Sequence, residues 1–266
     1  MISRLLTQLV SGARQGELDI VVVANGCTDD TASVAASFGP PVRVLSVPVA
    51  SKREALVAGD QAARGYPRVY VDADVELGAE DVRALAEALR APGALAAGPR
   101  RVLALAGSPW LVRWYYDVWA RLPAVRGGLF GRGVIAVSEA GHARVASLPP
   151  LLSDDLAASL VFAADERIIV PGARVVIHPP RTFGDLLRRR VRVATGVTQI
   201  EQAEGAPDST ARTRARDLLS VIRGEPRMAP RVLVFASVAV LARLRGNRAA
   251  RQRDYSTWHR DESSRR

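Results

Sequence analysis

Two carboxylates stand two residues apart at the end of the stretch Val69–Asp74. Its first half is β-branched and aromatic, which predicts a short buried strand. Residues i and i+2 of an extended chain point to the same side, so we expect Asp72 and Asp74, the acid pair, to converge. Two like charges so placed repel unless a cation, a substrate or protonation relieves them. A hard divalent ion, Mg²⁺ or Mn²⁺, bridging to phosphate oxygens would do so, and an ordinary turn is the alternative.

Two further polar residues fall where predicted elements meet. Asn25 follows Asp19–Ala24, a continuous apolar run typical of a strand buried on both faces. Lys52 is the only lysine of the chain and opens a predicted helix over 52–64, with Ser51 as its N-cap. Ligands bind at the carboxyl ends of strands in parallel α/β sheets, so we expect these residues to share one rim with the acid pair.

Later in the chain, Ser153-Asp154-Asp155 opens a predicted helix over 155–164. One acid at a helix N-terminus serves as a cap, which leaves Asp155 available for chemistry. A basic stretch is predicted as a helix over 185–193. It is either a solvated face or a group of guanidiniums near phosphates, and its candidate residues are Arg189, Arg190 and Arg192.

The elements that must position these residues alternate between strand and helix. Strands are predicted over Asp19–Ala24, Val42–Val47, Arg68–Val71 and Val134–Val137, and helices over 2–14, 31–38, 52–64 and 79–90. This alternation predicts an α/β fold with a mostly parallel sheet flanked by helices. Residues 167–178 are predicted as two short strands around Pro171-Gly172.

Composition changes after Gly205-Ala206-Pro207, where helices are predicted over 208–222 and 230–245. We therefore predict a main domain over 1–205 and a helical, Arg-rich C-terminal extension over 206–266. Residues 212–266 hold 14 Arg and 5 acidic residues, which is +9 of the net charge of +10. A basic, partly apolar extension fits an anionic membrane surface, and a solvated helical tail is the alternative. A nucleic-acid partner is not expected, because no recognisable nucleic-acid-binding fold accompanies the charge.

The chain has 266 residues, of which 48% are hydrophobic, and a single cysteine, Cys27. No disulfide can form within the chain, which favours a cytoplasmic location. The longest apolar run, Val232–Ala242, is too short to span a bilayer.

Two other stretches have open interpretations. Aromatic residues gather in a predicted helix after Pro109, either for core packing or as an apolar acceptor or membrane-facing surface. They are Trp110, Trp114, Tyr115, Tyr116 and Trp119. The glycine-rich stretch Arg126–Gly133 is not a phosphate-binding P-loop, because no Gly-Lys-Ser/Thr closes it. We expect it to allow close approach of its backbone to a substrate.

The ordered set of motifs resembles the family 2 glycosyltransferases over roughly residues 1–200. It comprises Asn25–Thr31, Lys52, the acid pair, Ser153-Asp154-Asp155 and Arg189–Arg192. The resemblance implies the GT-A fold and transfer of a sugar from a nucleotide-diphosphate donor to a hydroxyl acceptor, with inversion. It also implies a divalent metal, Mg²⁺ or Mn²⁺, on the donor diphosphate.

Residue by residue, the resemblance implies these roles. Asn25 would lie near the base and ribose, and Lys52 beside the nucleotide. Asp72 would contact the ribose or help to hold the metal that Asp74 ligates. Asp155 would be the general base. Arg189, Arg190 and Arg192 would face the diphosphate and acceptor.

The start of the chain departs from this family. Family members begin with a buried strand between the equivalents of Asp19–Ala24 and Val69–Val71, whereas Met1 opens directly into the predicted helix over 2–14. We therefore expect two unpaired strand edges. Three explanations of the missing strand stay open: the true start lies upstream, a partner supplies the strand, or the protein is a compromised remnant of the family. A non-catalytic binding or scaffold subunit of a membrane-associated glycan assembly system is the alternative function. Ala24, where the family usually has an acid, favours it too.

Overall fold

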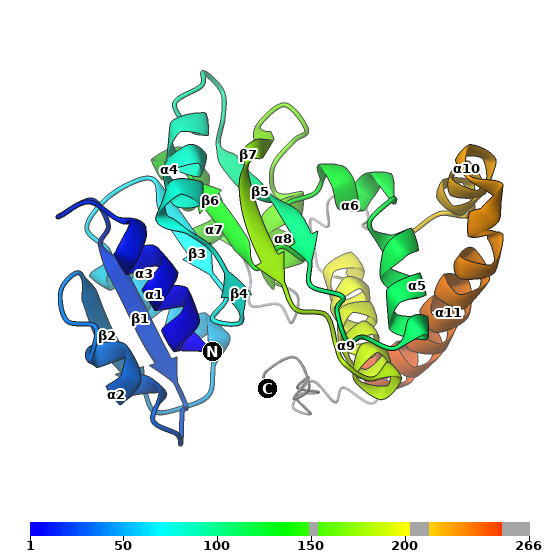
Figure 1. The fold of residues 1–266 in the computed structure, drawn as a ribbon, viewed down its shortest axis with the longest axis horizontal. Coiled ribbons are helices and arrows are strands. Elements are labelled where there is room, and N and C mark those ends of the chain that lie inside the picture. Colours follow the sequence, from blue (N-terminus) through cyan, green and yellow to red (C-terminus); the bar gives the residue numbers. More distant parts are fainter. Residues whose placement is uncertain (149–153, 203–212, 252–266) are drawn as a thin grey trace.

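The computed structural model describes residues 1–148, 154–202 and 213–251, in which strands and helices alternate (Figure 1). The strands are β1 (Ile20–Asn25), β2 (Val42–Val47), β3 (Arg68–Val71), β4 (Val75–Glu76), β5 (Ala96–Leu103), β6 (Val134–Val137) and β7 (Arg167–Ile177). The helices are α1 (Ile2–Gly12), α2 (Thr31–Ala36), α3 (Lys52–Ala62), α4 (Ala79–Ala88), α5 (Trp110–Trp119), α6 (Pro123–Gly127), α7 (Glu139–Ala146), α8 (Asp154–Leu160), α9 (Phe183–Gln202), α10 (Ala215–Gly224) and α11 (Ala229–Arg251), with a 3₁₀ turn at Pro226–Met228.

The strands and helices predicted in the first part of the chain, up to residue 90, are confirmed with shifted ends. The first four predicted helices each stop about two residues early, as expected of ends set by local hydrogen bonds rather than by apolar spacing. The predicted cap of α3 is present, because Ser51 Oγ accepts from the N–H of Glu54 at 3.3 Å. The predicted basic helix is the first part of the much longer α9.

The strands form two separate sheets. β1 and β2 pair in parallel as a two-stranded sheet, while the other strands form a five-stranded sheet in the order β3-β6-β5-β7-β4. Among the described residues, neither sheet hydrogen-bonds to the other, so β1 and β3 each have one edge that no described strand pairs with, as expected from the sequence. Most residues of β1 and all of β3 are only half-buried, although their apolar runs are typical of strands buried on both faces.

The larger sheet is mixed, so the expectation of a mostly parallel sheet is wrong for this part. β5 and β7 are parallel, but β6 runs antiparallel to β3 and β5, and β4 antiparallel to β7. The direction of β6 could not be predicted because this strand is a short apolar run like the others, and its residues carry no local sign of whether it pairs parallel or antiparallel.

β6 lies at the centre of the core because all four of its residues are buried. Val134 and Ala136 face a cluster that includes Leu5 of α1 and Leu85 of α4. Ile135 and Val137 face the opposite cluster, which includes Phe162 after α8. This is the alternation expected of a strand covered on both faces.

The two short strands predicted around Pro171-Gly172 are one continuous strand, β7. Its pairing with β5 shifts register between Pro99 and Arg100, where the partner jumps from Val170 to Arg174. The proline and glycine therefore form a bulge, which leaves the strand unbroken.

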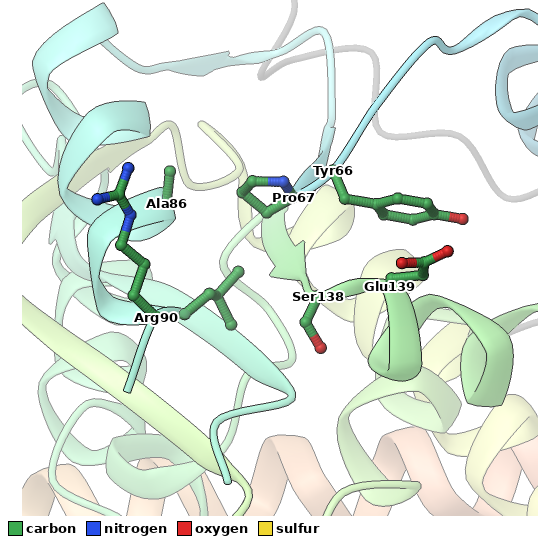
Figure 2. A pocket seen from close by; sticks show the side chains of 7 residues that line it. Tyr66, Pro67, Ala86, Arg90, Ser138 and Glu139 are labelled. Carbon is green, nitrogen blue, oxygen red and sulfur yellow. The ribbon is translucent and has the colours of Figure 1, made fainter. Parts of the chain in front are cut away.

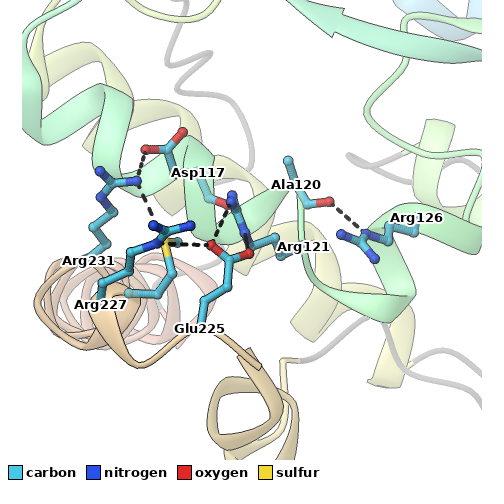
Figure 3. A network of polar contacts seen from close by, with 8 residues as sticks. Asp117, Ala120, Arg121, Arg126, Glu225, Arg227 and Arg231 are labelled. Carbon is cyan, nitrogen blue, oxygen red and sulfur yellow. Dashed lines mark hydrogen bonds and ion pairs between the residues drawn. The ribbon is translucent and has the colours of Figure 1, made fainter. Parts of the chain in front are cut away.

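The C-terminal helices pack against α5 and α9 at one end of the molecule (Figure 1). Phe235 of α11 stacks on Tyr115 of α5, with ring centroids 4.8 Å apart. Polar contacts join the same helices (Figure 3): Arg121 binds Glu225 at 3.0 Å, and Arg231 binds Asp117 at 2.9 Å. The predicted domain boundary near residue 205 lies outside the described residues, but the two sides of it share this core. Within the described ranges, no helix has both the length and the apolar character that crossing a membrane requires.

Candidate active site

The turn after β1 is tied to the start of α3. Asn25 Oδ1 accepts from the N–H of Ser51 at 2.7 Å, and the Gly26 N–H donates to Val47 O at 2.8 Å. Gly26 has φ +58°, and a Cβ there would lie 2.8 Å from the Ala50 backbone. Only glycine fits both the dihedral angle and the space. This turn fixes where α3 begins, and so where Lys52 stands.

Lys52 and Asp72 meet at the rim, as expected. Lys52 Nζ lies 3.5 Å from Asp72 Oδ1, and the two side chains are 40% and 47% exposed. The contact joins an element beside the small sheet to the end of a strand in the large one. Exposure of this degree leaves both groups accessible to a ligand and makes the ion pair itself a weak source of stability.

The acid pair lies in a turn, which corrects the argument from extended geometry. β3 ends at Val71, residues 73–74 form the turn, and β4 begins at Val75. Asp74 is half-buried, and its carboxylate makes no hydrogen bond or ion pair within the described chain. Oxygen donors two residues apart still suit a hard cation, although their directions follow from the turn and not from strand alternation.

Next to the acid pair, β4 and β7 bring His178 beside Glu76. His178 Nε2 lies 2.8 Å from Glu76 Oε1, and Arg4 NH1 lies 2.7 Å from the same oxygen. Burial raises the pKa of Glu76, but the hydrogen bonds from Arg4, His178 and Gln8 outweigh it and lower that pKa overall. No set of three or more His, Cys, Asp or Glu side chains in the described ranges could hold a metal by itself. Beyond the described side chains, a metal at the acid pair would need further oxygens, which a bound ligand can supply.

Asp155 is held by backbone N–H groups at the start of α8. Its Oδ2 accepts from Gly131 at 3.0 Å and its Oδ1 from Leu156 at 2.8 Å. Ser153, the first residue of the predicted motif, lies outside the described residues.

The glycine-rich stretch that binds Asp155 also binds the acid pair. The Asp72 N–H donates to Gly133 O at 2.7 Å, two residues beyond the glycine that binds Asp155. Gly133 has φ +65°, and a Cβ there would lie 2.6 Å from Val75 and 3.2 Å from Asp72 Oδ2. The stretch thus lies close to the protein's own chain at Asp72 and Asp155, and its expected close approach to a substrate stays a prediction.

Sequence reasoning missed two arginines beneath this stretch. Arg132 is 3% exposed and donates to the carbonyl oxygens of Gly128, Pro99 and Arg126 at 3.0, 2.5 and 3.0 Å. Arg101 donates to Val125 O and Gly128 O and lies over the Trp119 ring. Burial lowers the pKa of Arg132 to about 10 and that of Arg101 to about 9, the nearby Arg132 charge also contributing to the latter. Arginine side chains are normally exposed, so no sequence signal marked these two.

The arginines of α9 are not all directed to one site. Arg190 lies over the ring of Tyr115, 5.7 Å from its centroid, and thus faces α5. Arg188 pairs with Asp185 within the helix. Arg189 and Arg192 are half-buried, and their expected place near a diphosphate stays a prediction.

A cavity of about 280 Å³ lies at the opposite end of β3 from the acid pair (Figure 2). Tyr66 and Pro67, which precede β3, line it with Ser138 and Glu139, which follow β6. Because these strands are antiparallel, this end is remote from Asp72 and Gly133. The cavity is therefore separate from the candidate site.

The first part of the chain matches a known family. Residues 1–130 match the sequence model of Glycosyl transferase family 2. No functionally curated protein matches the sequence.

Two solved structures illustrate the fold likeness. One is a mannosyltransferase from Pyrobaculum calidifontis in complex with GDP-Man and Mn²⁺, with 18% identity, a TM-score of 0.60 and coverage of 94% of this chain and 71% of that one. The other is glucosyl-3-phosphoglycerate synthase from Mycobacterium tuberculosis in complex with Mn²⁺, UDP-glucose and phosphoglyceric acid. It has 21% identity, a TM-score of 0.55 and coverage of 77% of this chain and 76% of that one. At this identity the likeness concerns the fold. Together with the family match to its first 130 residues, this likeness supports a family 2 glycosyltransferase with the GT-A fold.

Proposed function

We propose that this protein transfers a sugar from a nucleoside-diphosphate donor to a hydroxyl acceptor with inversion, and that Asp155 is the general base. The acceptor is a sugar, a lipid-linked or a small-molecule alcohol. The similar solved structures with GDP-Man and UDP-glucose support the donor class. A lipid-linked acceptor would be met at the inner, cytoplasmic face of the membrane, where the basic C-terminal extension would make a peripheral contact.

The observation that carries the proposal is the glycine-rich stretch between the acids. Gly131 binds Asp155, and Gly133 binds the backbone of Asp72. A donor diphosphate at the acid pair and an acceptor hydroxyl at Asp155 would thus be held by one short segment. Such positioning is the main source of rate enhancement when two substrates must meet.

Each residue has a separate task. Asn25 holds the turn on which the nucleoside would lie, and Lys52, beside Asp72, would attract the diphosphate. Asp155 would take the proton of the acceptor hydroxyl as its oxygen attacks the anomeric carbon. One displacement, with the nucleoside diphosphate leaving on the opposite side, inverts that carbon. Arg189 and Arg192 would contribute positive charge from α9, whereas Arg190 faces α5.

The residues present fit a divalent metal, Mg²⁺ or Mn²⁺. Asp74 is half-buried with no partner in the described chain, and Asp72 lies two residues away, so both offer hard oxygen ligands. The donor diphosphate would supply the remaining oxygen ligands of the metal. When bound, such an ion would stabilise the negative charge that develops on the leaving diphosphate.

The test is a thermal-shift screen of nucleotide sugars with and without Mn²⁺, followed by a transfer assay with the donor that binds. We expect Asp155→Asn to abolish transfer and keep donor binding. Asp74→Ala should remove the Mn²⁺-dependent part of binding. The exposed Asp165→Asn is the matched control and should change neither. Normal transfer by Asp155→Asn would refute the base assignment, and unchanged metal dependence in Asp74→Ala would refute the metal site.

A non-catalytic binding or scaffold subunit of a membrane-associated glycan assembly system is the second candidate. The separation of β1 from β3 favours it, because a break in the sheet beside the site would loosen the alignment that catalysis needs. Donor binding without hydrolysis or transfer by the purified protein would support this candidate over the enzyme.

A further inference from the structure

Helix α11 has apolar residues on two faces, and the described part of the chain covers only one of them. The covered face packs on α5 and α9 through Val232, Phe235, Val238 and Ala242. The other face carries residues three, four or seven positions apart, which line up along one side of a helix. They are Leu233, Val240, Leu241 and Leu244, and Leu233 is 69% exposed. We call these four residues the outer stripe.

Positive charge lies on both sides of the outer stripe. Arg243 and Arg245 are exposed and flank Leu244 in sequence, so at 100° per residue they point to opposite sides of it. No acidic residue occurs in α11. The acids of the preceding segment are already engaged, since Glu225 pairs with Arg121 and Asp217 caps α10.

An exposed tryptophan lies near the first turns of the same helix. Arg231 of α11 sits over the ring of Trp114, and Trp110 packs edge-on against Trp114 with centroids 4.9 Å apart. Trp110 is 58% exposed. A tryptophan with one free side is typical of residues at a membrane–water interface.

We propose that the outer stripe docks on an anionic lipid surface, with α11 lying in the plane of the headgroups. An apolar stripe flanked by arginines can insert its side chains shallowly while the guanidiniums reach lipid phosphates. A second copy of the chain packed stripe against stripe would offer no carboxylate on α11 to either arginine. The charge on this face therefore favours lipid over self-association. This contact uses the body of α11 and does not depend on sugar transfer.

The experiment is vesicle co-sedimentation of the full chain. Vesicles of phosphatidylcholine alone are compared with vesicles containing about one third phosphatidylglycerol. We expect binding to the anionic vesicles that falls at high salt, with a blue shift of tryptophan fluorescence that Trp110→Phe reduces. Leu233→Ser/Leu244→Ser should lower the partition coefficient by about tenfold or more. Arg243→Gln/Arg245→Gln should lower it by about fivefold per arginine, on anionic vesicles only.

The matched control changes two exposed apolar residues far from α11, Val49→Ser/Val57→Ser, and should bind as the parent chain does. Circular dichroism of each variant checks that it is folded. Equal binding by Leu233→Ser/Leu244→Ser and the control would overturn the proposal. Equal binding of the parent chain to neutral and to anionic vesicles would also overturn it. A dimer in sedimentation velocity that Leu233→Ser/Leu244→Ser dissociates would show that a second copy covers the stripe, which also overturns it.

Discussion

Replacing Gly133 tests whether the glycine-rich stretch really holds the acid pair. In Gly133→Ala the new Cβ would lie 2.6 Å from Val75 Cγ1, and Val75 is 5% exposed and confined by its core cluster. The φ of +65° adds a second penalty. We estimate roughly 1–2 kcal/mol for the left-handed dihedral angle and about 1–3 kcal/mol for the overpacking. The loss of unfolding free energy should be about 2–5 kcal/mol in total.

The matched control is Gly16→Ala. Gly16 has φ +72°, and a Cβ added there would meet no atom within 4 Å, so this variant carries the dihedral penalty alone. Urea unfolding gives the loss of unfolding free energy in each variant, and the difference between the two losses is the cost of the contact with Val75. Calorimetry with Mn²⁺ and a nucleoside diphosphate should show weaker binding in Gly133→Ala only, because the displaced Val75 directly follows Asp74 in the chain.

A double variant makes the test sharper. Val75→Ala removes the methyl group that the new Cβ would meet, so Gly133→Ala/Val75→Ala should lose less stability than the sum of the two single variants. If Gly133→Ala costs no more than Gly16→Ala, or if the double variant is merely additive, the close approach at Gly133 is refuted.

Three further outcomes are expected. The pKa of Glu17 is lowered to about 2, first by the hydrogen bond from Arg83, so its contribution to stability is full above its usual value of 4.5 and is lost as the pH falls towards 2; Glu17→Gln should flatten acid unfolding curves in that window. Arg132→Met should lower kcat by a larger factor than it changes the KM for the donor, because it frees the segment bound to Asp155, whereas Arg132→Lys should recover part of the lost kcat. Tyr115→Phe removes a buried hydroxyl that has no partner in the described chain, and should change stability by less than about 1 kcal/mol or raise it, by urea unfolding.

The sequence was informative where local chemistry decides the structure. Ser51 and the β-branched runs have strong local preferences, so the cap of α3 and β1, β2 and β3 could be predicted from them. The meeting of Lys52 and Asp72 followed from the rule that strand ends share a rim.

Long-range pairing decides what sequence reasoning missed. The direction of β6 depends on its neighbours β3 and β5, which local residues do not encode. The burial of Arg132 depends on carbonyls from 99, 126 and 128, which come together only in the folded chain. The acid pair forms a turn because β4 pairs with β7, about a hundred residues later.

The break between the sheets has a consequence for the site. Asn25 and Lys52 belong to the small sheet and its helix, whereas Asp72 and Asp155 belong to the large sheet and its loops. In the part of the chain that the structure describes, no strand pairing joins these halves, and the exposed contact between Lys52 and Asp72 is too weak to fix their spacing.

Apolar packing therefore sets the spacing between the small sheet and the large sheet. Leu5 and Leu9 of α1 belong to a cluster against which Ile20 of β1 and Val69 of β3 both pack. Packing of this kind is less directional than backbone pairing, so the two halves can shift relative to each other more easily than strands of one sheet could. The nucleoside half and the metal half of the site would then be aligned fully only when a donor spans both, which makes donor binding itself part of assembling the site.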